Sequence, residues 1–319
     1  MNLASRTAFG RTGLGVSPLA LGTSSWGPVR SGESTEDRDS RIGVLADAFF
    51  TGAVPTNFID TSNMYGDSES EVHIGRALAR IGGLPDGVVL QTKLDRRMDN
   101  DVFDGNQMRR SLDQSLERLG VDNVQVLYLH DPEVIGFEAA MAAGGPVEAL
   151  VAMKEQGLAA YIGISGGPVD MLTQFVETDL FDALVTHNRF TLVDRSAEAL
   201  IQAAVARNLG ITNAAPYGAG VLTGDPRFAG TYGYRPIRPQ VQAAVDAITA
   251  LCAEAGVSLA AAALQFSLRD PRIHGTIVGV ASLPRFEETV AQADEVIPEG
   301  IWAEIDKVLP PASAALDAR

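Results

Sequence analysis

The sequence contains very little cysteine, and this scarcity limits the covalent and redox chemistry open to it. Cys252 is the only cysteine among 319 residues. A single thiol cannot form an intrachain disulfide, and it cannot contribute to a cluster of thiolates around a metal. We therefore expect a protein of a reducing compartment.

Positive charge and long apolar runs are also scarce. The chain has 25 lysines and arginines against 40 aspartates and glutamates, a formal net charge of −15. Such a surface repels phosphate backbones and anionic lipid, so we expect neither a nucleic-acid nor a membrane partner. No run of about 18 apolar residues occurs, and the N-terminal stretch MNLASRTAFGRTGLG lacks the apolar core of a secretory leader. These features predict a cytoplasmic protein.

Two motifs that would indicate other chemistries are missing. The histidines, at positions 73, 130, 187 and 274, show no H-x-x-x-H spacing, so we expect no metal. The first apolar run is not followed by G-x-G-x-x-G at the start of a helix. That motif would be expected of a dinucleotide-binding Rossmann unit.

The chain does contain a regular alternation of short apolar runs and helical segments. Continuous rather than alternating apolar character is typical of parallel strands buried on both faces. Strands are predicted at 19–23, 57–62, 88–93, 124–130, 161–165, 183–187, 210–215 and 275–280. Helices are predicted at 36–51, 69–81, 105–119, 138–156, 168–177, 194–208, 239–269 (as one or two pieces) and 284–294.

Eight alternating units favour a closed (β/α)8 TIM barrel, because eight strands enclose a lumen that side chains just fill. A doubly wound open sheet is the alternative. Residues 1–18 contain FGRTGL, which predicts an N-terminal hairpin that plugs the bottom of the barrel. The stretch IWAEIDKVL after residue 296 predicts an extra C-terminal helix. No composition shift suggests a linker, so we expect a single α/β domain over 1–319.

Four titratable residues lie at or just beyond neighbouring strand ends, where barrel enzymes place their reacting groups. They are Asp60, Tyr65, Lys93 and His130. Each alone could be a cap, a packing residue or a structural charge. Their conjunction on adjacent strands favours a site for moving a proton on a carbonyl or alcohol oxygen.

Proton transfer by Tyr65 requires help, because a phenol has a pKa of about 10. A lysine ammonium about 4 Å from a phenolate interacts by roughly 4 kcal/mol at an effective dielectric of about 20, the equivalent of about 3 pKa units. We therefore expect Lys93 to lower the pKa of Tyr65 towards the working pH, where an acid or base is most effective. Asp60 would hold Lys93, and His130 would contact the substrate oxygen.

These residues occur within motifs that resemble those of the aldo-keto reductases, in the same order along nearly the whole chain. The motifs are FGRTGL at 9–14, DTSNMYG at 60–66, QTK at 91–93, LH at 129–130 and GIS at 163–165. The stretches HNRFTLVDR at 187–195 and NAAPYG at 213–218 are similar to those of the sugar and pyridoxal dehydrogenases within that family, a group that includes L-fucose (D-threo-aldose) 1-dehydrogenase and pyridoxal 4-dehydrogenase.

The resemblance implies a (β/α)8 fold and an enzyme that transfers hydride between NAD(P)(H) and a small-molecule substrate. It implies that Asp60, Tyr65, Lys93 and His130 are the catalytic tetrad, with Tyr65 as general acid/base. Tyr65 and His130 would contact the substrate, and Trp26 would form a flat wall for its ring or else only cover the core.

The resemblance also implies three groups of cofactor-binding residues. The nicotinamide site would be lined by Gly22, Thr23, Asp60, Ser165, Gly166, His187 and Asn188. The pyrophosphate loop would contain Pro216, Tyr217, Gly218, Gly220 and Leu222, with small residues that let a phosphate approach. The adenosine loop would contain Gly279, Val280, Ser282, Arg285 and Glu288.

Three positions depart from the common family pattern. Gly166 stands where many members have an asparagine that contacts the carboxamide, and Ala214 where many have an aromatic residue stacked on the nicotinamide. Ser282 stands where NADP-preferring relatives often have lysine or arginine, and a phosphate without a strong cationic partner is poorly held. We therefore expect NAD, with NADP possible through Arg285, and a preference for oxidation.

The most specific hypothesis is an NAD(P)-dependent dehydrogenase that oxidises an aldose, pyridoxal or a related cyclic hemiacetal, with a lactone as product. Three alternatives remain open. One is a general NADPH-dependent aldehyde or ketone reductase. Another is a lyase that forms a Schiff base on Lys93. The third is a non-catalytic, cofactor-sensing regulator like the potassium-channel β-subunits. The sequence carries no indication of oligomeric state.

Overall fold

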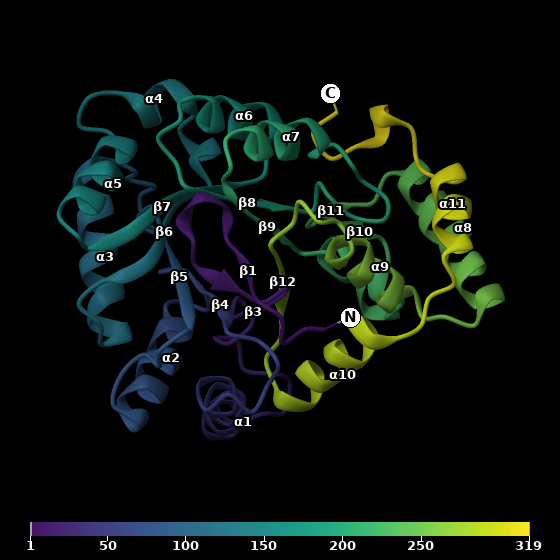
Figure 1. Ribbon diagram of the computed structural model, residues 1–319, viewed down its shortest axis with the longest axis horizontal. Helices are drawn as coiled ribbons and strands as arrows, with labels where there is room; N and C mark the ends of the chain where they lie inside the picture. The colour runs from purple at the N-terminus through teal and green to yellow at the C-terminus, as the bar shows by residue number, and fades with distance from the viewer. Residues whose placement is uncertain (1, 319) are drawn as a thin grey trace.

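Eight parallel strands form a closed barrel at the centre of the computed structural model, which describes residues 2–318 (Figure 1). The strand order around the barrel is β12-β3-β4-β5-β6-β7-β8-β9, so the last strand closes the ring against the first. The strands are β3 (Leu19–Gly22), β4 (Phe58–Asp60), β5 (Val89–Leu94), β6 (Val124–His130), β7 (Ala159–Gly166), β8 (Ala183–His187), β9 (Gly210–Ala214) and β12 (Gly275–Gly279). The predicted barrel and its eight strands are confirmed, and the open sheet is excluded.

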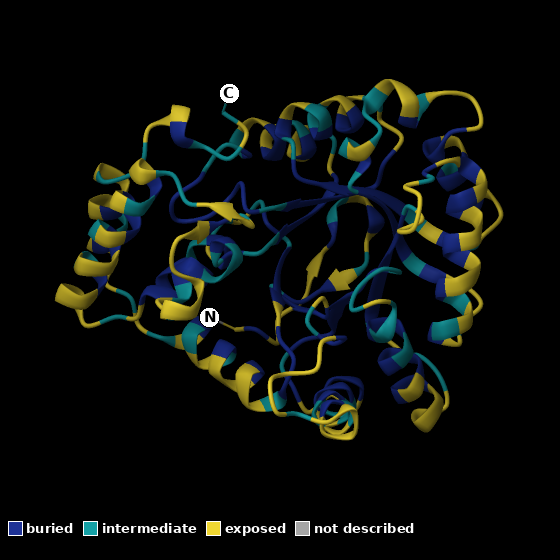
Figure 2. Cartoon of the chain, turned by 180° about the vertical axis from the view of Figure 1, so that it is seen from behind, coloured by how far each residue is buried: buried dark blue, intermediate teal, exposed yellow. Residues whose placement is uncertain are grey.

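The strands are buried on both faces, as their continuous apolar sequences require. Figure 2 shows the barrel strands in the buried class and the outward faces of the helices exposed. Inward side chains such as Phe58, Val126 and Tyr128 fill the lumen, while outward ones such as Leu90 and Leu127 contact the helices. The interior of the barrel is therefore a packed core rather than a pore.

Helices surround the barrel and cover its outer face. They are α1 (Thr35–Phe50), α2 (Glu69–Ile81), α3 (Gly105–Leu119), α4 (Phe137–Met141), α5 (Pro146–Glu155), α6 (Val169–Glu177), α7 (Glu198–Ala206), α8 (Pro239–Ala255), α9 (Leu259–Leu268), α10 (Leu283–Asp294) and α11 (Gly300–Lys307). Helix α3 shows how the local sequence determines where a helix begins and ends. Asp104 caps its start by accepting from the Gln107 amide, and Gly120 ends it in the left-handed conformation (φ 67°). Met108 and Leu112 are buried on its inner face.

Two predicted helices differ from the observed ones by more than one residue. The predicted helix 138–156 is two helices, α4 and α5, because Gly144 takes a positive φ of 72° and Pro146 starts a new helix at its first position. Helix α7 starts four residues later than the predicted 194, because Asp194 accepts hydrogen bonds from Ser196 and holds a turn there. The predicted segment 239–269 is two pieces, α8 and α9.

The N-terminal hairpin closes the bottom of the barrel. Strands β1 (Thr7–Ala8) and β2 (Gly15–Val16) pair antiparallel. Phe9, between them, is fully buried, and its ring lies edge-on to Phe58 with centroids 5.4 Å apart. Gly210 at the start of β9 leaves room for this ring, because a Cβ there would lie 2.6 Å from it. The predicted plug is confirmed.

The C-terminal part of the chain forms two helices outside the barrel and a tail that returns to it. Helices α8 and α11 pack together outside the ring of barrel helices (Figure 1). The tail then returns to the barrel, where Asp317 binds Arg189 at 2.6 Å and accepts from the Val169 amide. Within residues 2–318, no single helix is long and apolar enough to cross a membrane; only α8 and α9 together, bent by 101° at their junction, meet that test.

Candidate active site

A cavity of about 860 Å³ opens at the carboxyl ends of the barrel strands. The parallel register brings these ends together: Gly22 is paired with Asp60, Asp60 with Gln91, and His130 with Ser165. Residues that are far apart in sequence therefore line one mouth. The cavity is of a size typical for cofactor and small-molecule sites.

The four predicted catalytic residues converge on this cavity. Lys93 Nζ lies 2.8 and 2.9 Å from the two carboxylate oxygens of Asp60 and 3.1 Å from the Tyr65 hydroxyl. It also donates to the Thr61 carbonyl at 2.8 Å. The rings of Tyr65 and His130 are perpendicular, with centroids 5.8 Å apart. A reacting oxygen placed beside the Tyr65 hydroxyl would therefore face His130 as well.

The electrostatics around Tyr65 differ from the expectation. Burial raises the pKa of Tyr65 well above its ordinary value of 10, and the carboxylates of Asp60, Asp95 and Asp131 raise it further. The pKa is therefore not lowered as predicted, although Lys93 Nζ is close to the hydroxyl; the same Nζ is bound by both carboxylate oxygens of Asp60. The expected lowering of the Tyr65 pKa is thus wrong for the cofactor-free protein, and its hydroxyl is held as a phenol.

His130 is paired with a carboxylate that lies beyond β5. Its Nδ1 is 2.6 Å from Asp95 Oδ1. Burial disfavours the charged imidazolium, but Asp95 and Asp131 outweigh it, so the pKa of His130 is raised. The pKa of Asp95 is lowered: burial acts against this, but the charge and hydrogen bond of His130 and the hydroxyl of Ser62 outweigh it.

A polar wall extends from His130 along the cavity. Asp131 and His187 line it. His187 Nδ1 faces the side-chain amide of Asn188 at 3.0 Å, which leaves Nε2 to carry the proton. Burial first, and then the charge of Arg189, lower the pKa of His187 to about 4. His187 is therefore a neutral donor at physiological pH.

Glu133 occupies space that the missing side chain at position 166 leaves free. A Cβ on Gly166 would lie 2.8 Å from Glu133 Oε2. Glu133 Oε1 accepts from the Gly167 amide at 3.1 Å, whereas Oε2 is buried and has no hydrogen-bond partner among the described residues. Burial and then Asp131 raise the pKa of Glu133. A carboxyl group thus stands behind the wall where the resemblance implied an asparagine amide in many relatives.

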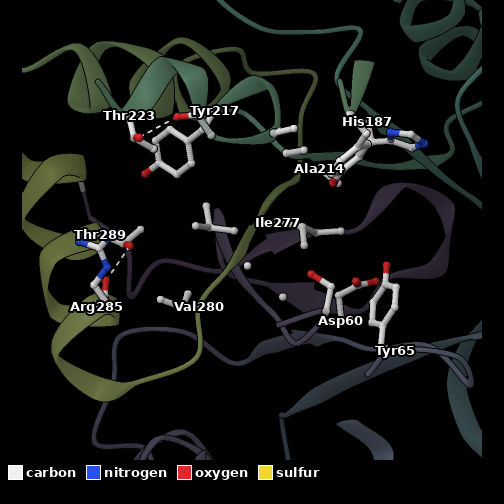
Figure 3. A pocket seen from close by; sticks show the side chains of 18 of the residues that line it. Asp60, Tyr65, His187, Ala214, Tyr217, Thr223, Ile277, Val280, Arg285 and Thr289 are labelled. Carbon is white, nitrogen blue, oxygen red and sulfur yellow. Dashed lines mark hydrogen bonds between the residues drawn. The ribbon is translucent and has the colours of Figure 1, made fainter. Parts of the chain in front are cut away.

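The opposite end of the cavity has a different character. Figure 3 shows Asp60 and Tyr65 at one end and Arg285 and Thr289 at the other, with Ile277 and Val280 between them. Apolar residues therefore separate a proton-transfer end from an end that carries a guanidinium. This elongated shape suits an extended ligand with a reactive head and an anionic or polar tail.

A model of the aldo/keto reductase family matches residues 18–310. The chain belongs to the aldo/keto reductase family. It is an NAD(P)-dependent oxidoreductase, and the family uses nicotinamide cofactors, mostly NADPH.

Named relatives match this aldo/keto reductase over nearly its full length. It is 29% identical to L-galactose dehydrogenase of Arabidopsis thaliana, over 95% of this chain and 94% of that protein. It is 29% identical to D-threo-aldose 1-dehydrogenase of a Pseudomonas species, over 93% and 95%, and 25% identical to pyridoxal 4-dehydrogenase of Microbacterium luteolum, over 95% and 96%. A solved aldo-keto reductase structure from Pseudomonas aeruginosa superposes with a TM-score of 0.65 at 23% identity, covering 92% of this chain and 95% of that one, which supports the fold alone.

The residues of this aldo/keto reductase fit a nicotinamide cofactor. Gly22 and Gly279, which are paired between β3 and β12, line the cavity without a side chain. The loop before α8 lines the cavity with Ala219 and Gly220, which have small or no side chains and both take a positive φ. Its glycines are also required for packing, because a Cβ on Gly220 would collide with the Phe228 ring at 2.5 Å. Backbone N–H groups on a surface of this kind can donate hydrogen bonds to phosphate oxygens.

Most predicted site residues line the cavity, and the others lie behind its wall. Those that line it are Gly22, Asp60, Tyr65, Lys93, His130, Ser165, His187, Tyr217, Gly220, Gly279, Val280, Arg285 and Glu288. Those that do not are Thr23, Trp26, Gly166, Asn188, Pro216, Gly218, Leu222 and Ser282. The second group supports the first: Thr23, for example, donates its hydroxyl to the Asp60 carbonyl at 2.9 Å.

The prediction that Trp26 forms a substrate wall is wrong. Its side chain is fully buried in the main hydrophobic core, and its indole nitrogen donates to the Val280 carbonyl at 2.7 Å. A buried tryptophan needs such a partner for its N–H, and the backbone at the end of β12 provides one. Trp26 therefore holds the loop after β3 to the loop after β12.

Two clusters have the composition of a metal site, although none was expected from the sequence. The ligand atoms of Asp131, Glu133 and His187 lie within 4.8 Å of one another. Asp131 and His187 line the cavity, whereas Glu133 lies behind its wall and accepts from the Gly167 amide. The other cluster is on α1 and α2 and is neutralised by arginines; it comprises Asp39, Glu69 and His73.

Sequence reasoning missed three groups at the mouth. Asp95 lies two residues beyond Lys93, and Asp131 follows His130 directly, so the only available signal was a titratable residue next to a recognised one. Tyr234 lines the cavity from a hairpin formed by β10 (Thr231–Tyr232) and β11 (Arg235–Pro236). Nothing in the sequence near Tyr234 connects it to the catalytic strands.

Proposed function

We propose that this aldo/keto reductase oxidises the anomeric hydroxyl of a neutral polyhydroxylated cyclic hemiacetal, an aldose or a pyridoxal-like ring, to the lactone. One observation carries the proposal: the Tyr65–Lys93–Asp60 cluster and the polar side chains of Asp131 and His187 line the same end of the cavity. Asp131 accepts hydrogen bonds from substrate hydroxyls, and His187 donates one. The relatives named for L-galactose, D-threo-aldose and pyridoxal oxidation support this substrate class.

The negative charge near the polar wall further restricts the class of substrate that we expect. Asp131, Asp95 and Glu133 surround the reacting position, and Lys93 is already engaged by Asp60. An anionic substrate such as a uronic or 2-oxo acid would meet unfavourable charge there. Neutral sugars are therefore expected to be better substrates than acidic ones.

The residues divide the reaction between them. A nicotinamide cofactor bound in the cavity would supply the acceptor for the hydride that leaves the anomeric carbon. Tyr65 and His130 face the anomeric oxygen. As the carbonyl forms, the Tyr65 hydroxyl takes up the substrate proton and passes its own proton to the neutral ring of His130, so that one proton moves in all. Lys93 holds the Tyr65 hydroxyl in place, and Asp60 and the Thr61 carbonyl hold Lys93. The alcohol thus loses one hydride and one proton, and the lactone remains.

The far end of the cavity supports NAD over NADP. Among the described residues that line that end, Arg285 is the cation, and it is already bound by Glu288. Asp225 lines the same region, and its pKa is lowered to about 2 by its hydrogen bonds with Arg227. A 2′-phosphate would add about two negative charges beside these carboxylates. An unphosphorylated ribose hydroxyl could instead donate to Glu288.

A second candidate is carbonyl reduction with NADPH, and one observation favours it. The raised pKa of Tyr65 keeps its hydroxyl protonated, which is the form that donates to a carbonyl oxygen. The lyase alternative is disfavoured, because a Schiff base needs a free lysine amine and Lys93 Nζ is bound by Asp60 and by the Thr61 carbonyl.

The test is absorbance of reduced nicotinamide with purified protein, either NAD or NADP, and L-fucose, L-galactose, D-arabinose or pyridoxal in turn. Tyr65→Phe should abolish turnover and leave cofactor affinity nearly unchanged, while Tyr161→Phe, at the other end of the barrel, should behave as wild type. Cofactor binding without turnover of any substrate would favour the regulator alternative. Near wild-type turnover in Tyr65→Phe would contradict the proposed role of the phenol.

A further inference from the structure

Asp95 is a buried carboxylate just beyond β5 that the reaction above does not yet use. Its Oδ1 lies 2.6 Å from His130 Nδ1. Its Oδ2 accepts from the Ser62 hydroxyl and from the Met64 amide, the latter at 3.1 Å. Its own amide donates to Ser111 Oγ at 3.0 Å, and its side chain is only 4% exposed. Asp95 is therefore fixed at both its backbone and its side chain.

This arrangement determines how the imidazole is oriented. An ionised carboxylate can only accept hydrogen bonds, so His130 must donate from Nδ1. Nε2, on the other side of the ring, then lies towards the cavity, 3.8 Å from Asp131 Oδ1. We propose that Asp95 is a positioning residue that fixes the tautomer of His130 and holds Nε2 at the substrate oxygen. The proposal rests on the proposed function for its catalytic consequence only.

The backbone around Asp95 supports this role. The Met64 amide and the Ser62 hydroxyl both donate to Oδ2, and Met64 directly precedes Tyr65. One carboxylate thus links the loop that carries Tyr65 to the ring of His130. A side chain that only filled space would not need hydrogen bonds to both.

The charges that face His130 determine when it carries a second proton. They come from several elements and comprise Lys93 on β5, Asp95 after β5, Asp131 and Glu133 after β6, and His187 on β8, with the Tyr65 phenol opposite. Neutral His130 accepts the substrate proton in oxidation, so the oxidation rate should rise as the pH rises through the pKa of His130. In reduction the protonated ring donates, so that rate should fall over the same range.

Asp95→Asn should reverse the tautomer. The amide oxygen of the asparagine would face the two donors at Ser62 and Met64, so its NH₂ would face Nδ1 and force the proton to Nε2. The resulting loss in kcat should be about 100-fold or more, because a general acid or base contributes about 10²–10⁴-fold. KM should change little, because Asp95 does not line the cavity.

The deciding measurement is nitrogen NMR of ¹⁵N-histidine-labelled full-length protein without cofactor. The chain has only four histidines, and a His130→Gln variant assigns the signal. We expect an Nδ1–H tautomer in the wild type and an Nε2–H tautomer in Asp95→Asn. In the pH profile of that variant, the rise in the oxidation rate should occur at lower pH than in the wild type. Asp131→Asn removes an equal charge near the ring and should keep the Nδ1–H tautomer. Asp122→Asn, exposed at the other end of β6, should change nothing.

The readouts separate the two proposals. An Nε2–H tautomer in the wild type would overturn the role of Asp95, even where Asp95→Asn does not fold. An Asp95→Asn variant with wild-type kcat would overturn it as well. Absence of dehydrogenase activity in the wild type would instead contradict the proposed function, while the tautomer would still show whether Asp95 orients His130.

Discussion

The Lys93–Asp60 pair should stabilise the fold as well as the site. Both side chains are buried, 1% and 3% exposed, and their closest atoms lie 2.8 Å apart. Lys93→Met keeps most of the side-chain volume but leaves Asp60 as a buried carboxylate without its cation, at a cost of about 3–5 kcal/mol. Unfolding entropy is about 2.1 cal/mol/K per residue, so for 319 residues the melting temperature should fall by about 4–7 °C.

A double-mutant cycle measures the coupling. Asp60→Asn in the Lys93→Met background removes the orphaned charge and still leaves an oxygen for the Gln91 amide, so the double variant should be more stable than Lys93→Met. The exposed pair Arg80–Asp47 is the control, where Arg80→Met should cost at most about 1 kcal/mol. Unfolding is followed by circular dichroism. If the free energy of unfolding lost in the double variant equals the sum of the losses in the two single variants, the pair has no coupling and the reasoning is refuted.

Two further predictions concern the two ends of the barrel. Phe9→Ala should lower the free energy of unfolding by about 3–5 kcal/mol, because it leaves a cavity where the buried ring was. KM should stay unchanged, and a large change in KM would show that the bottom of the barrel is coupled to the site. Gly66→Ala should lower kcat by about tenfold or more, because Gly66 has φ +61° and its new Cβ would lie 2.3 Å from Gly27 Cα, which displaces Tyr65. Gly82→Ala has a similar positive φ but open space around it, so it should lower stability by about 1 kcal/mol without affecting kcat.

The sequence predicts the barrel well because buried parallel strands are continuous apolar runs. The same runs show where each strand ends, and a closed parallel barrel brings all those ends to one mouth. This is why Asp60, Lys93 and His130 could be grouped without a structure. The break within 138–156 was visible in principle, since Gly144, Gly145 and Pro146 follow one another.

What the sequence could not provide depends on distances and on loops. The pKa of Tyr65 depends on its burial and on the carboxylates of Asp60, Asp95 and Asp131 around it, and only the geometry shows how these groups lie. Trp26 could point into the cavity or the core, and its position after a strand does not distinguish them. Asp95 became significant only once the loop after β5 was seen to face His130.

The closure of the barrel has a consequence for how this protein is synthesised. Strand β12 supplies the partner of β3 on one side and of β9 on the other. Until residues 275–279 leave the ribosome, β3 and β9 each present an unpaired edge, and such edges bind other strands readily. A nascent chain that stalls before residue 275 should therefore depend on chaperones to stay soluble, whereas the released chain can close both edges with a single strand.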